Sequence, residues 1–219
     1  MSMGSYNVLI IGVGGQGVIF ASSVLGRAAL NSGLNVVIGE TKGLARRGGT
    51  VEAHVKIGYS ENLSPLIPPG YVDLLLSFEF MEGLRYLNRV RRGGIAVIST
   101  ESIKPINSYI YRGEKYPKVD SSIDILSEYA GINNVKIILF DPKPIVSKLK
   151  LPQVANMAML GFAYGVSGVN VGKVEFIKAI RDVARGRYVK ENIEAFNEGL
   201  RCSENVKAKI SKPGLVVFP

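Results

Sequence analysis

Short aliphatic segments separated by helical patterns fill the N-terminal part of the chain. The aliphatic segments are as continuous as strands buried on both faces of a sheet require. They lie at residues 8–11, 35–39, 72–78, 95–99 and 135–140. Helical patterns lie between them at residues 18–31, 81–90 and 123–130. This alternation predicts an α/β fold with a doubly wound, mostly parallel, Rossmann-like sheet.

One segment, residues 50–57 (TVEAHVKI), follows a different pattern. Apolar side chains occupy every second position, and the polar residues Glu52, His54 and Lys56 fall on the opposite face. This is the period of a strand with one face in water. We therefore expect an antiparallel element at the edge of the sheet, in which His54 has a structural or surface role.

The C-terminal part of the sequence is mainly helical. Residues 155–166 (ANMAMLGFAYGV) are apolar almost all round, so we expect this helix to be buried in the domain or against a partner. Residues 173–181 and 189–206 have amphipathic patterns. The tail, residues 211–219, is apolar but outside any helix, which suggests that it docks onto a neighbouring surface.

No internal repeat or low-complexity tract divides the chain. We interpret residues 1–219 as a single domain. Its Rossmann-like core covers about residues 1–165, and a helical C-terminal extension with the tail covers about residues 166–219.

The first predicted strand ends directly in a glycine-rich turn. Gly12, Gly14 and Gly17 fit the pattern G-x-G-x-x-G, and a predicted helix follows them. Glycines allow positive φ angles and close approach of the backbone, while the start of a helix presents free N–H groups to an anion. We therefore expect Gly14 to occupy a position of positive φ or close approach. Packing alone is the alternative explanation for such a turn.

Glu40 follows the turn at about the distance at which dinucleotide-binding folds place the acid that binds ribose. It opens a second motif, residues 40–49 (ETKGLARRGG), after the second predicted strand. Glycines that bracket two arginines suggest a backbone bent around a negatively charged group or packed closely on a neighbour. The candidate cofactor-binding residues are Gly12, Gly14, Gly15, Gln16, Gly17, Glu40, Arg46, Arg47, Gly48 and Gly49.

The amino-acid composition excludes several kinds of metal and catalytic site. The chain of 219 residues has one cysteine and one histidine, so it has too few ligands for an iron–sulfur cluster or a cysteine-rich metal site. H-E-x-x-H, G-x-S-x-G and G-x-x-x-x-G-K-[ST] motifs are absent, and no catalytic residue is identified. No apolar run is as long as a membrane span, and the N-terminus lacks the features of a signal peptide, so we expect a cytoplasmic protein.

The formal net charge of +9 raises the question of nucleic-acid binding. The basic residues are spread along the chain rather than gathered in one tract, and no known nucleic-acid-binding module accompanies them. We expect no nucleic-acid partner and no membrane partner. A partner subunit, an acidic electron carrier or a phosphorylated ligand would use the same positive field.

The two glycine motifs together resemble a known family. GVGGQGV followed by ETKGLARRGGTVEAHVKIG is similar to the small subunit of 2-oxoacid:ferredoxin oxidoreductases, and most similar to the beta subunit of indolepyruvate ferredoxin oxidoreductase. The likeness continues through SPLIPPGYVDLLLSFE and ANMAMLGFAYG to about Gly165. The family often has histidine at the position of Lys42 and glutamine at that of Arg46.

The resemblance implies a subunit that is inactive alone. In this family thiamine diphosphate and the iron–sulfur clusters belong to a large partner subunit. The complex oxidatively decarboxylates a 2-oxoacid, here indolepyruvate or another aryl pyruvate, passes electrons to ferredoxin and transfers the acyl group to coenzyme A. The small subunit completes the active-site region and, in related enzymes, contributes to coenzyme A binding, for which the glycine turn and the arginines are suited.

Other interpretations stay open at this point. The chain also fits a gamma subunit of a pyruvate or branched-chain 2-oxoacid ferredoxin oxidoreductase. A stand-alone dinucleotide-binding dehydrogenase would explain the glycine turn, but the sequence lacks its catalytic His/Lys/Tyr constellation. A non-enzymatic nucleotide- or nucleic-acid-binding module is a third class.

Overall fold

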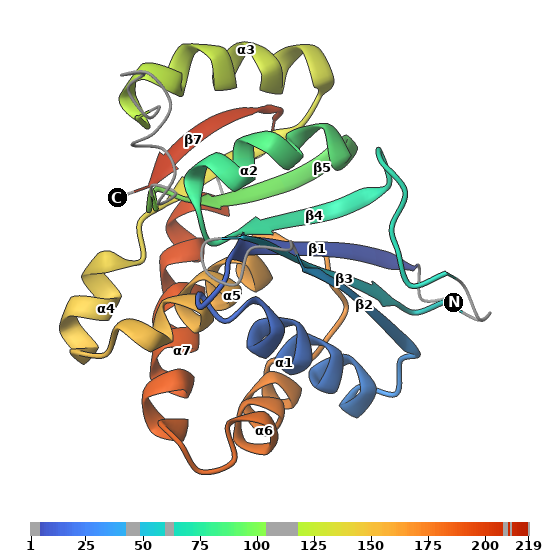
Figure 1. Ribbon diagram of the computed structural model, residues 1–219, viewed down its shortest axis with the longest axis vertical. Coiled ribbons are helices and arrows are strands. Elements are labelled where there is room, and N and C mark those ends of the chain that lie inside the picture. The colour runs from blue at the N-terminus through green and yellow to red at the C-terminus, as the bar shows by residue number, and fades with distance from the viewer. Residues whose placement is uncertain are drawn as a thin grey trace.

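A seven-stranded sheet with the order β2-β3-β1-β4-β5-β6-β7 forms the centre of the protein (Figure 1). The computed structural model describes residues 5–42, 49–59, 64–103, 118–207, 210 and 212–218. The strands are β1 (Tyr6–Val13), β2 (Val36–Lys42), β3 (Thr50–Ile57), β4 (Val72–Ser77), β5 (Val90–Ser99), β6 (Lys136–Phe140) and β7 (Gly214–Phe218). β3 pairs antiparallel with both β2 and β1, and the ladders from β1 to β7 are parallel.

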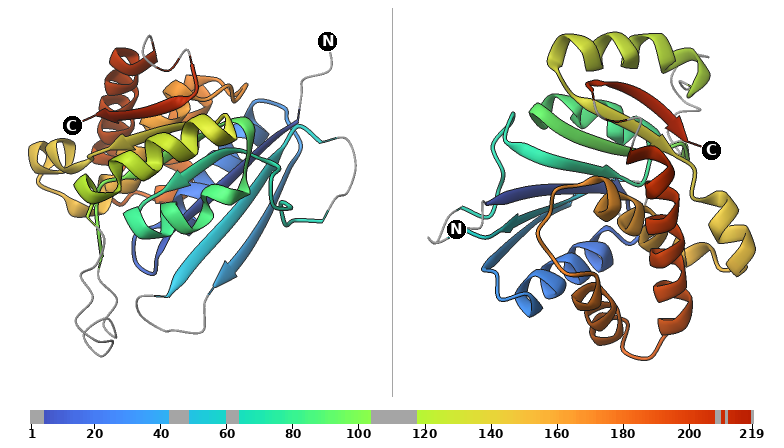
Figure 2. Two further views of the ribbon diagram at one scale, coloured as in Figure 1. Left: turned by 90° about the horizontal axis from the view of Figure 1, so that it is seen from above. Right: turned by 180° about the vertical axis from the view of Figure 1, so that it is seen from behind.

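Helices cover both faces of this sheet. In Figure 1, and from behind in Figure 2, α2 and α3 lie on one face, while α1, α5, α6 and α7 lie on the other. The helices are α1 (Val18–Asn31), α2 (Phe80–Tyr86), α3 (Ile123–Asn133), α4 (Lys143–Leu149), α5 (Ala155–Val166), α6 (Lys173–Ala184) and α7 (Val189–Lys207). Short 3-10 turns are η1 (Leu87–Arg89), η3 (Asp120–Ser122) and η4 (Pro152–Val154). The architecture confirms the predicted α/β fold.

The residues of strand β1 form an uninterrupted aliphatic run because both faces of this strand are buried. Val8 and Ile10 belong to the apolar cluster on the α1 face, whereas Leu9 and Ile11 belong to the cluster on the α2 face. All of them are fully buried. Burying one such side chain stabilises the fold by about 1.5–3 kcal/mol, so both layers are held to this central strand.

Strand β3 pairs antiparallel as predicted, but its polar face is not in water. It lies second from the sheet edge, inside β2. His54 and Lys56 are 2% and 7% exposed because the segment after β3 folds back over them. The main-chain N–H of Ile67 donates to Nδ1 of His54 (3.1 Å), and Nζ of Lys56 donates to the carbonyl oxygen of Ser64 (3.0 Å). His54 therefore has the structural role that was expected.

The apolar helix α5 is buried within this chain, against α7. A Cβ atom added at Gly161 of α5 would lie 2.0 Å from the carbonyl oxygen of Phe196. One added at Gly199 of α7 would lie 2.0 Å from the carbonyl oxygen of Ala158. The two helices approach this closely only because both positions lack a side chain.

The apolar tail forms a strand of the same sheet. Gly214–Phe218 pairs in parallel with β6, and Phe218 lies opposite Phe140 in the register. The two rings are 6.0 Å apart, and Phe162 of α5 stacks on Phe140 at 4.1 Å. The surface onto which the tail docks is therefore the edge of β6.

Candidate functional site

The glycine turn connects β1 to α1 at the carboxyl end of the sheet. Gly15 and Gly17 have φ angles of 103° and 80°, whereas Gly14 does not adopt a positive φ. Gly17 is the N-cap of α1, and its carbonyl oxygen accepts the first helical hydrogen bond, from Ala21 (3.0 Å). The expected left-handed backbone is therefore present at Gly15 and at Gly17, where the helix begins, and not at Gly14.

Gln16 fastens the turn to the neighbouring strand. Its Oε1 accepts a hydrogen bond from the main-chain N–H of Val13 (2.8 Å), and its Nε2 donates to the carbonyl oxygen of Phe78 (2.9 Å). A Cβ atom at Gly12 would lie 2.8 Å from Oε1 of Gln16. Gly12 and Gln16 therefore serve packing between the ends of β1 and β4.

The second motif returns to this turn. The main-chain N–H of Gly14 donates to the carbonyl oxygen of Gly49 (3.0 Å). Arg46, Arg47 and Gly48 lie outside the described residues. The structure thus joins the last residue of the arginine motif to the glycine turn.

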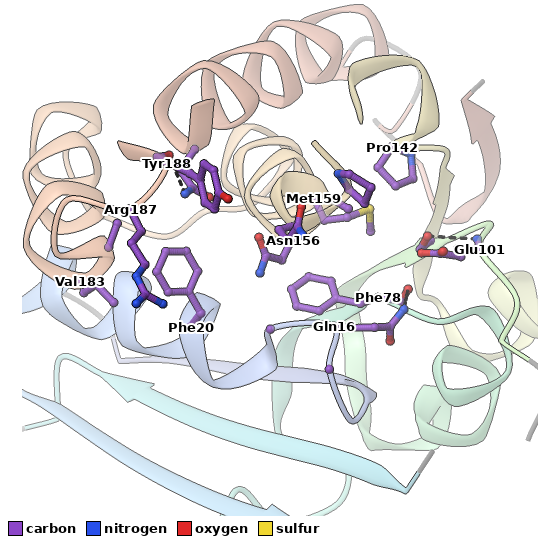
Figure 3. A pocket seen from close by; sticks show the side chains of 18 of the residues that line it. Gln16, Phe20, Phe78, Glu101, Pro142, Asn156, Met159, Val183, Arg187 and Tyr188 are labelled. Carbon is purple, nitrogen blue, oxygen red and sulfur yellow. Dashed lines mark hydrogen bonds between the residues drawn. The ribbon is translucent and has the colours of Figure 1, made fainter. Parts of the chain in front are cut away.

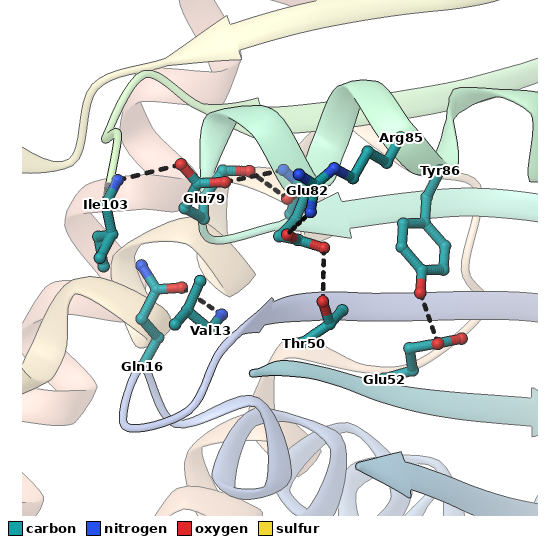
Figure 4. Close-up of polar contacts among 10 residues, drawn as sticks. Val13, Gln16, Thr50, Glu52, Glu79, Glu82, Arg85, Tyr86 and Ile103 are labelled. Atoms are coloured by element: carbon teal, nitrogen blue, oxygen red, sulfur yellow. Dashed lines mark hydrogen bonds and ion pairs between the residues drawn. The ribbon is translucent and has the colours of Figure 1, made fainter. Parts of the chain in front are cut away.

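Two glutamates of the α2 region hold the segments around the turn (Figure 4). Glu82 Oε2 accepts from the hydroxyl of Thr50 (2.9 Å), the residue after Gly49, and its Oε1 accepts from Arg85 (2.7 Å). Glu79 is fully buried and caps α2, because its Oε2 accepts from the main-chain N–H of Glu82 (2.7 Å). Its Oε1 accepts from the main-chain N–H of Ile103 (3.0 Å).

A second polar group lies further along β3. Tyr86 donates a hydrogen bond to Oε1 of Glu52 (2.5 Å), and Nε2 of His54 lies 3.5 Å from Oε2 of Glu52. The His54 hydrogen bond, helped by that from Tyr86, lowers the pKa of Glu52 despite its partial burial. Burial, with the adjacent Glu52 carboxylate, raises the pKa of Tyr86. This group fixes β3 to α2.

Glu40 does not meet the glycine turn. It is an exposed residue of β2, opposite Ala53 of β3, which in turn lies opposite Ile10 of β1. With neighbouring strands about 4.8 Å apart, Glu40 is about 10 Å from β1 and level with its middle. The ribose-binding geometry inferred from its spacing requires β2 beside β1, and β3 occupies that place.

A pocket of about 550 Å³ opens at the carboxyl ends of β1, β4 and β5, on the α1 face (Figure 3). We call it the strand-end pocket. It lies where the strand order reverses between β1 and β4, the usual ligand position in open α/β sheets. Gly15, Gln16 and Gly17 line it, whereas Gly12, Gly14, Glu40 and Gly49 do not. Other lining residues include Phe20, Phe78, Glu101, Asn156, Met159, Arg187, Tyr188 and Asn192.

Sequence reasoning missed Asn156, which is 7% exposed. Its Oδ1 is buried without a hydrogen-bond partner, and its Nδ2 would be 2.0 Å from a Cβ atom at Gly17. A polar residue within an otherwise apolar helix, ANMAMLGFAYGV, was the available signal. Buried polar groups normally have partners, and this oxygen is an exception in the wall of the pocket.

The pocket has opposite charges at its two ends. Figure 3 shows Arg187 and Phe20 at one end and Glu101 and Pro142 at the other. Burial raises the pKa of the half-buried Glu101 carboxyl, and the positive charge of Lys143 opposes this rise. The lining can therefore hold an elongated ligand with its anionic part directed toward Arg187.

The described part of the chain contains neither a candidate metal site nor a helix that could span a membrane. There, His, Cys, Asp and Glu residues form no group of three or more that could hold a metal ion. Over the same residues, every helix is too short or too polar to cross a membrane.

Comparisons with known proteins agree with this fold. Residues 7–202 match the pyruvate ferredoxin/flavodoxin oxidoreductase family. The chain is 33% identical to indolepyruvate oxidoreductase subunit IorB of Archaeoglobus fulgidus, over 88% of this chain and 92% of that protein. It is 34% identical to the IorB subunit of Methanothermobacter thermautotrophicus, over 89% of this chain and 96% of that protein.

A solved structure has the same fold. The gamma subunit of a keto/oxoacid ferredoxin oxidoreductase from Geobacter sulfurreducens aligns with a TM-score of 0.65 and 23% identity. The alignment covers 91% of this chain and 99% of that subunit. The family match spans both glycine motifs, nearly all of strands β1 to β6 and most of α7, and it ends before β7. This chain therefore belongs to the pyruvate ferredoxin/flavodoxin oxidoreductase family.

Proposed function

We propose that this chain is the small subunit of an indolepyruvate-type 2-oxoacid:ferredoxin oxidoreductase and that it works in a complex with a large subunit. The identities of 33% and 34% with indolepyruvate oxidoreductase subunits support this assignment. With one cysteine, the chain cannot supply the thiolates of an iron–sulfur cluster. The clusters are therefore assigned to the large subunit, which passes electrons to ferredoxin. We assign thiamine diphosphate to the same subunit, as the resemblance implies.

The hydrogen bond between Gly14 and Gly49 carries the proposal for this chain's own part. It returns the end of the arginine motif to the glycine turn, beside the first N–H groups of α1. Helix-start N–H groups and guanidinium groups are both strong donors to phosphate. We infer that Arg46, Arg47 and the turn contact the phosphates of coenzyme A in an active site shared with the large subunit.

In this assignment the chain binds and orients the acyl acceptor. The large subunit's thiamine diphosphate supplies the chemistry of 2-oxoacid decarboxylation. Contacts from the arginine motif hold coenzyme A so that its sulfur receives the acyl group. The surrounding positive charge, +9 for the whole chain, favours the approach of this polyanionic acceptor.

Co-expression with the large subunit tests this function. The complex should reduce an electron acceptor in a reaction that depends on indolepyruvate and coenzyme A, and the isolated chain should not. Arg47→Ala should leave assembly intact and raise the KM for coenzyme A by about tenfold or more, the effect of losing one charge-assisted hydrogen bond. Arg27→Ala, an exposed change on the far half of α1, is the matched control and should change nothing.

The other outcomes separate the parts of the proposal. If Arg46→Ala/Arg47→Ala weakens association with the large subunit at unchanged turnover, the motif is an interface and does not contact coenzyme A. If neither association nor turnover changes, the motif has no role in the complex. Stoichiometric iron and sulfide in the pure chain would contradict the assignment of the clusters to the partner.

A further inference from the structure

Strand β2 ends the sheet on the side opposite β7 (Figure 1). Among the described residues, no further strand pairs with its outer edge. We propose that an extended segment of a partner chain adds to this edge as an eighth strand of the sheet. This partner is the large subunit of the proposed function, on which the inference rests.

A hydrogen bond at the start of β2 shows which of its main-chain groups face outward. In an antiparallel ladder, every second pair of opposite residues exchanges both main-chain hydrogen bonds. The N–H of Gly58 donates to the carbonyl oxygen of Asn35 (2.8 Å), and these two residues continue the register of β2 and β3. Val37 therefore directs its N–H and C=O toward β3. Val36 and Ile38 direct theirs away from the sheet.

The other side of β3 gives the same result independently. The N–H of Gly14 donates to the carbonyl oxygen of Gly49 (3.0 Å), and this pair continues the register of β1 and β3. The odd-numbered residues from 49 to 57 thus face β1, and the even-numbered ones face β2. Lys56, which lies opposite Val37, is one of the latter. Both ladders therefore assign the outward direction to Val36 and Ile38.

This edge lacks the features with which proteins usually prevent strands from pairing. Charged residues, prolines and bulges are the common means. Residues 36–39 (VVIG) include neither a charged residue nor a proline, and the ladder with β3 runs without a bulge from Val36 to Lys42. An edge of this kind is a template for the addition of a strand from another chain.

Exposed apolar side chains lie on both faces of the sheet beside the edge. Ile38 is 39% exposed and packs on α1, where a Cβ atom at Gly26 would lie 2.6 Å from its Cδ1. Leu30, about one turn later on α1, is 52% exposed. On the opposite face Pro65 packs on β2, and the adjacent Leu66 is 46% exposed. An added strand with apolar side chains on both faces would cover these positions.

Two observations favour the large subunit over a second copy of this chain. First, β2 runs directly into the arginine motif, which the proposed function places in the active site shared with the large subunit. A partner that reaches this motif therefore lies within a few residues of the β2 edge. Second, another copy would bring a further net charge of +9 to the same surface, and like charges oppose association.

Amide hydrogen exchange, measured at single residues in the isolated chain and in the co-expressed complex, tests this arrangement. In the isolated chain the amides of Val36 and Ile38 should exchange fast, while those of Val37 and Gly39 should exchange slowly because they bond to β3. In the complex, exchange at Val36 and Ile38 should slow by about tenfold or more. Val37 and Gly39 are the internal controls.

A charge on the edge provides a second test. Ile38→Lys should weaken association with the large subunit by about tenfold or more, because a lysine on an edge strand opposes pairing. The aliphatic part of the lysine can keep the contact with α1, so the melting temperature should change little. Ile132→Lys, the same change at an exposed position of α3, is the matched control and should leave association unchanged. If Ile38→Lys fails to fold, the exchange comparison on the wild type still decides.

The outcomes separate this inference from the proposed function. An active complex in which Val36 and Ile38 exchange as fast as in the isolated chain would overturn the added strand and leave the proposed function standing. Slow exchange of these two amides in the isolated chain that depends on its concentration would assign the edge to a second copy instead. If the large subunit forms no complex with this chain, the proposed function and the added strand are both wrong.

Discussion

The main-chain N–H of Gly14 donates a hydrogen bond to the carbonyl oxygen of Gly49 across 3.0 Å. The antiparallel register explains this contact, because Val13 of β1 lies opposite Thr50 of β3 and the next residues outward are these two glycines. The glycine turn and the arginine motif lie apart in the sequence, and the pairing of β1 with β3 brings them together. A change in the arginine motif therefore has a direct route to the backbone of the glycine turn.

Gly17→Ala should lower the free energy of unfolding by about 1–3 kcal/mol, because the position has a φ of 80° and the added Cβ would meet Nδ2 of Asn156. Gly14→Ala is the control within the same turn. Its φ is not positive and its nearest new neighbour, the oxygen of Gly49, is 3.8 Å away, so its cost should stay below about 1 kcal/mol. Urea unfolding of both variants checks this, and equal losses would show that the turn does not distinguish the two positions.

Gly161→Ala should destabilise the protein by about 3 kcal/mol or more, since the new methyl group would press on the backbone of α7 at Phe196. Gly131→Ala in α3 meets no atom within 4 Å and should instead gain up to about 1 kcal/mol from helix propensity. Thermal unfolding of the two variants should therefore move in opposite directions. A neutral Gly161→Ala would mean that α5 and α7 are separated more widely.

Tyr86→Phe should destabilise the protein most at neutral pH. Its hydroxyl donates to Glu52, whose pKa is lowered in the fold, so this stabilisation is present above the ordinary glutamate pKa and is lost as pH falls through the folded value. We expect a loss of about 1–2 kcal/mol at pH 7 that shrinks below about pH 4. Chemical unfolding at both pH values measures it, and a loss independent of pH would assign the effect to ring packing alone.

Glu101→Gln should raise the melting temperature at pH 7. Burial raises the pKa of Glu101, so its contribution to stability is full below the ordinary glutamate pKa and is lost as pH rises through the folded value. The gain should therefore vanish near pH 4, where the native carboxyl is protonated. Glu194→Gln on the exposed side of α7 is the control for removing a negative charge. An equal gain from both changes would point to net charge rather than burial.

The sequence pattern predicted those parts of the fold that depend on local burial. Val8 to Ile11 had to lie in a strand covered on both faces, and the glycine turn had to lie between that strand and a helix. The polar face of β3 was predicted to be wet because nothing near His54 or Lys56 in the sequence reveals that residues 64–70 fold back over them.

The candidate site was only partly predictable for the same reason. Gly15, Gln16 and Gly17 line the strand-end pocket as a glycine turn at a helix start should. The spacing of Glu40 suggested a ribose contact, but the insertion of β3 between β2 and β1 is a long-range event that spacing does not encode. Asn156 and Arg187 come from α5 and from the connection after α6, and only tertiary packing brings them to the turn.

Strand β7 covers a sheet edge that could otherwise pair with other molecules. Without it, the edge of the sheet would be β6, whose sequence KIILF is rich in β-branched and aromatic residues and nearly uncharged. Such an exposed edge is a template for pairing with other molecules. Helices α4 to α7 lie between β6 and β7 in the chain, so this pairing closes a long loop, and we expect it to form late in folding. The interval before that closure is when the protein is most open to aggregation, and conditions that favour early docking of β7 should raise its soluble yield.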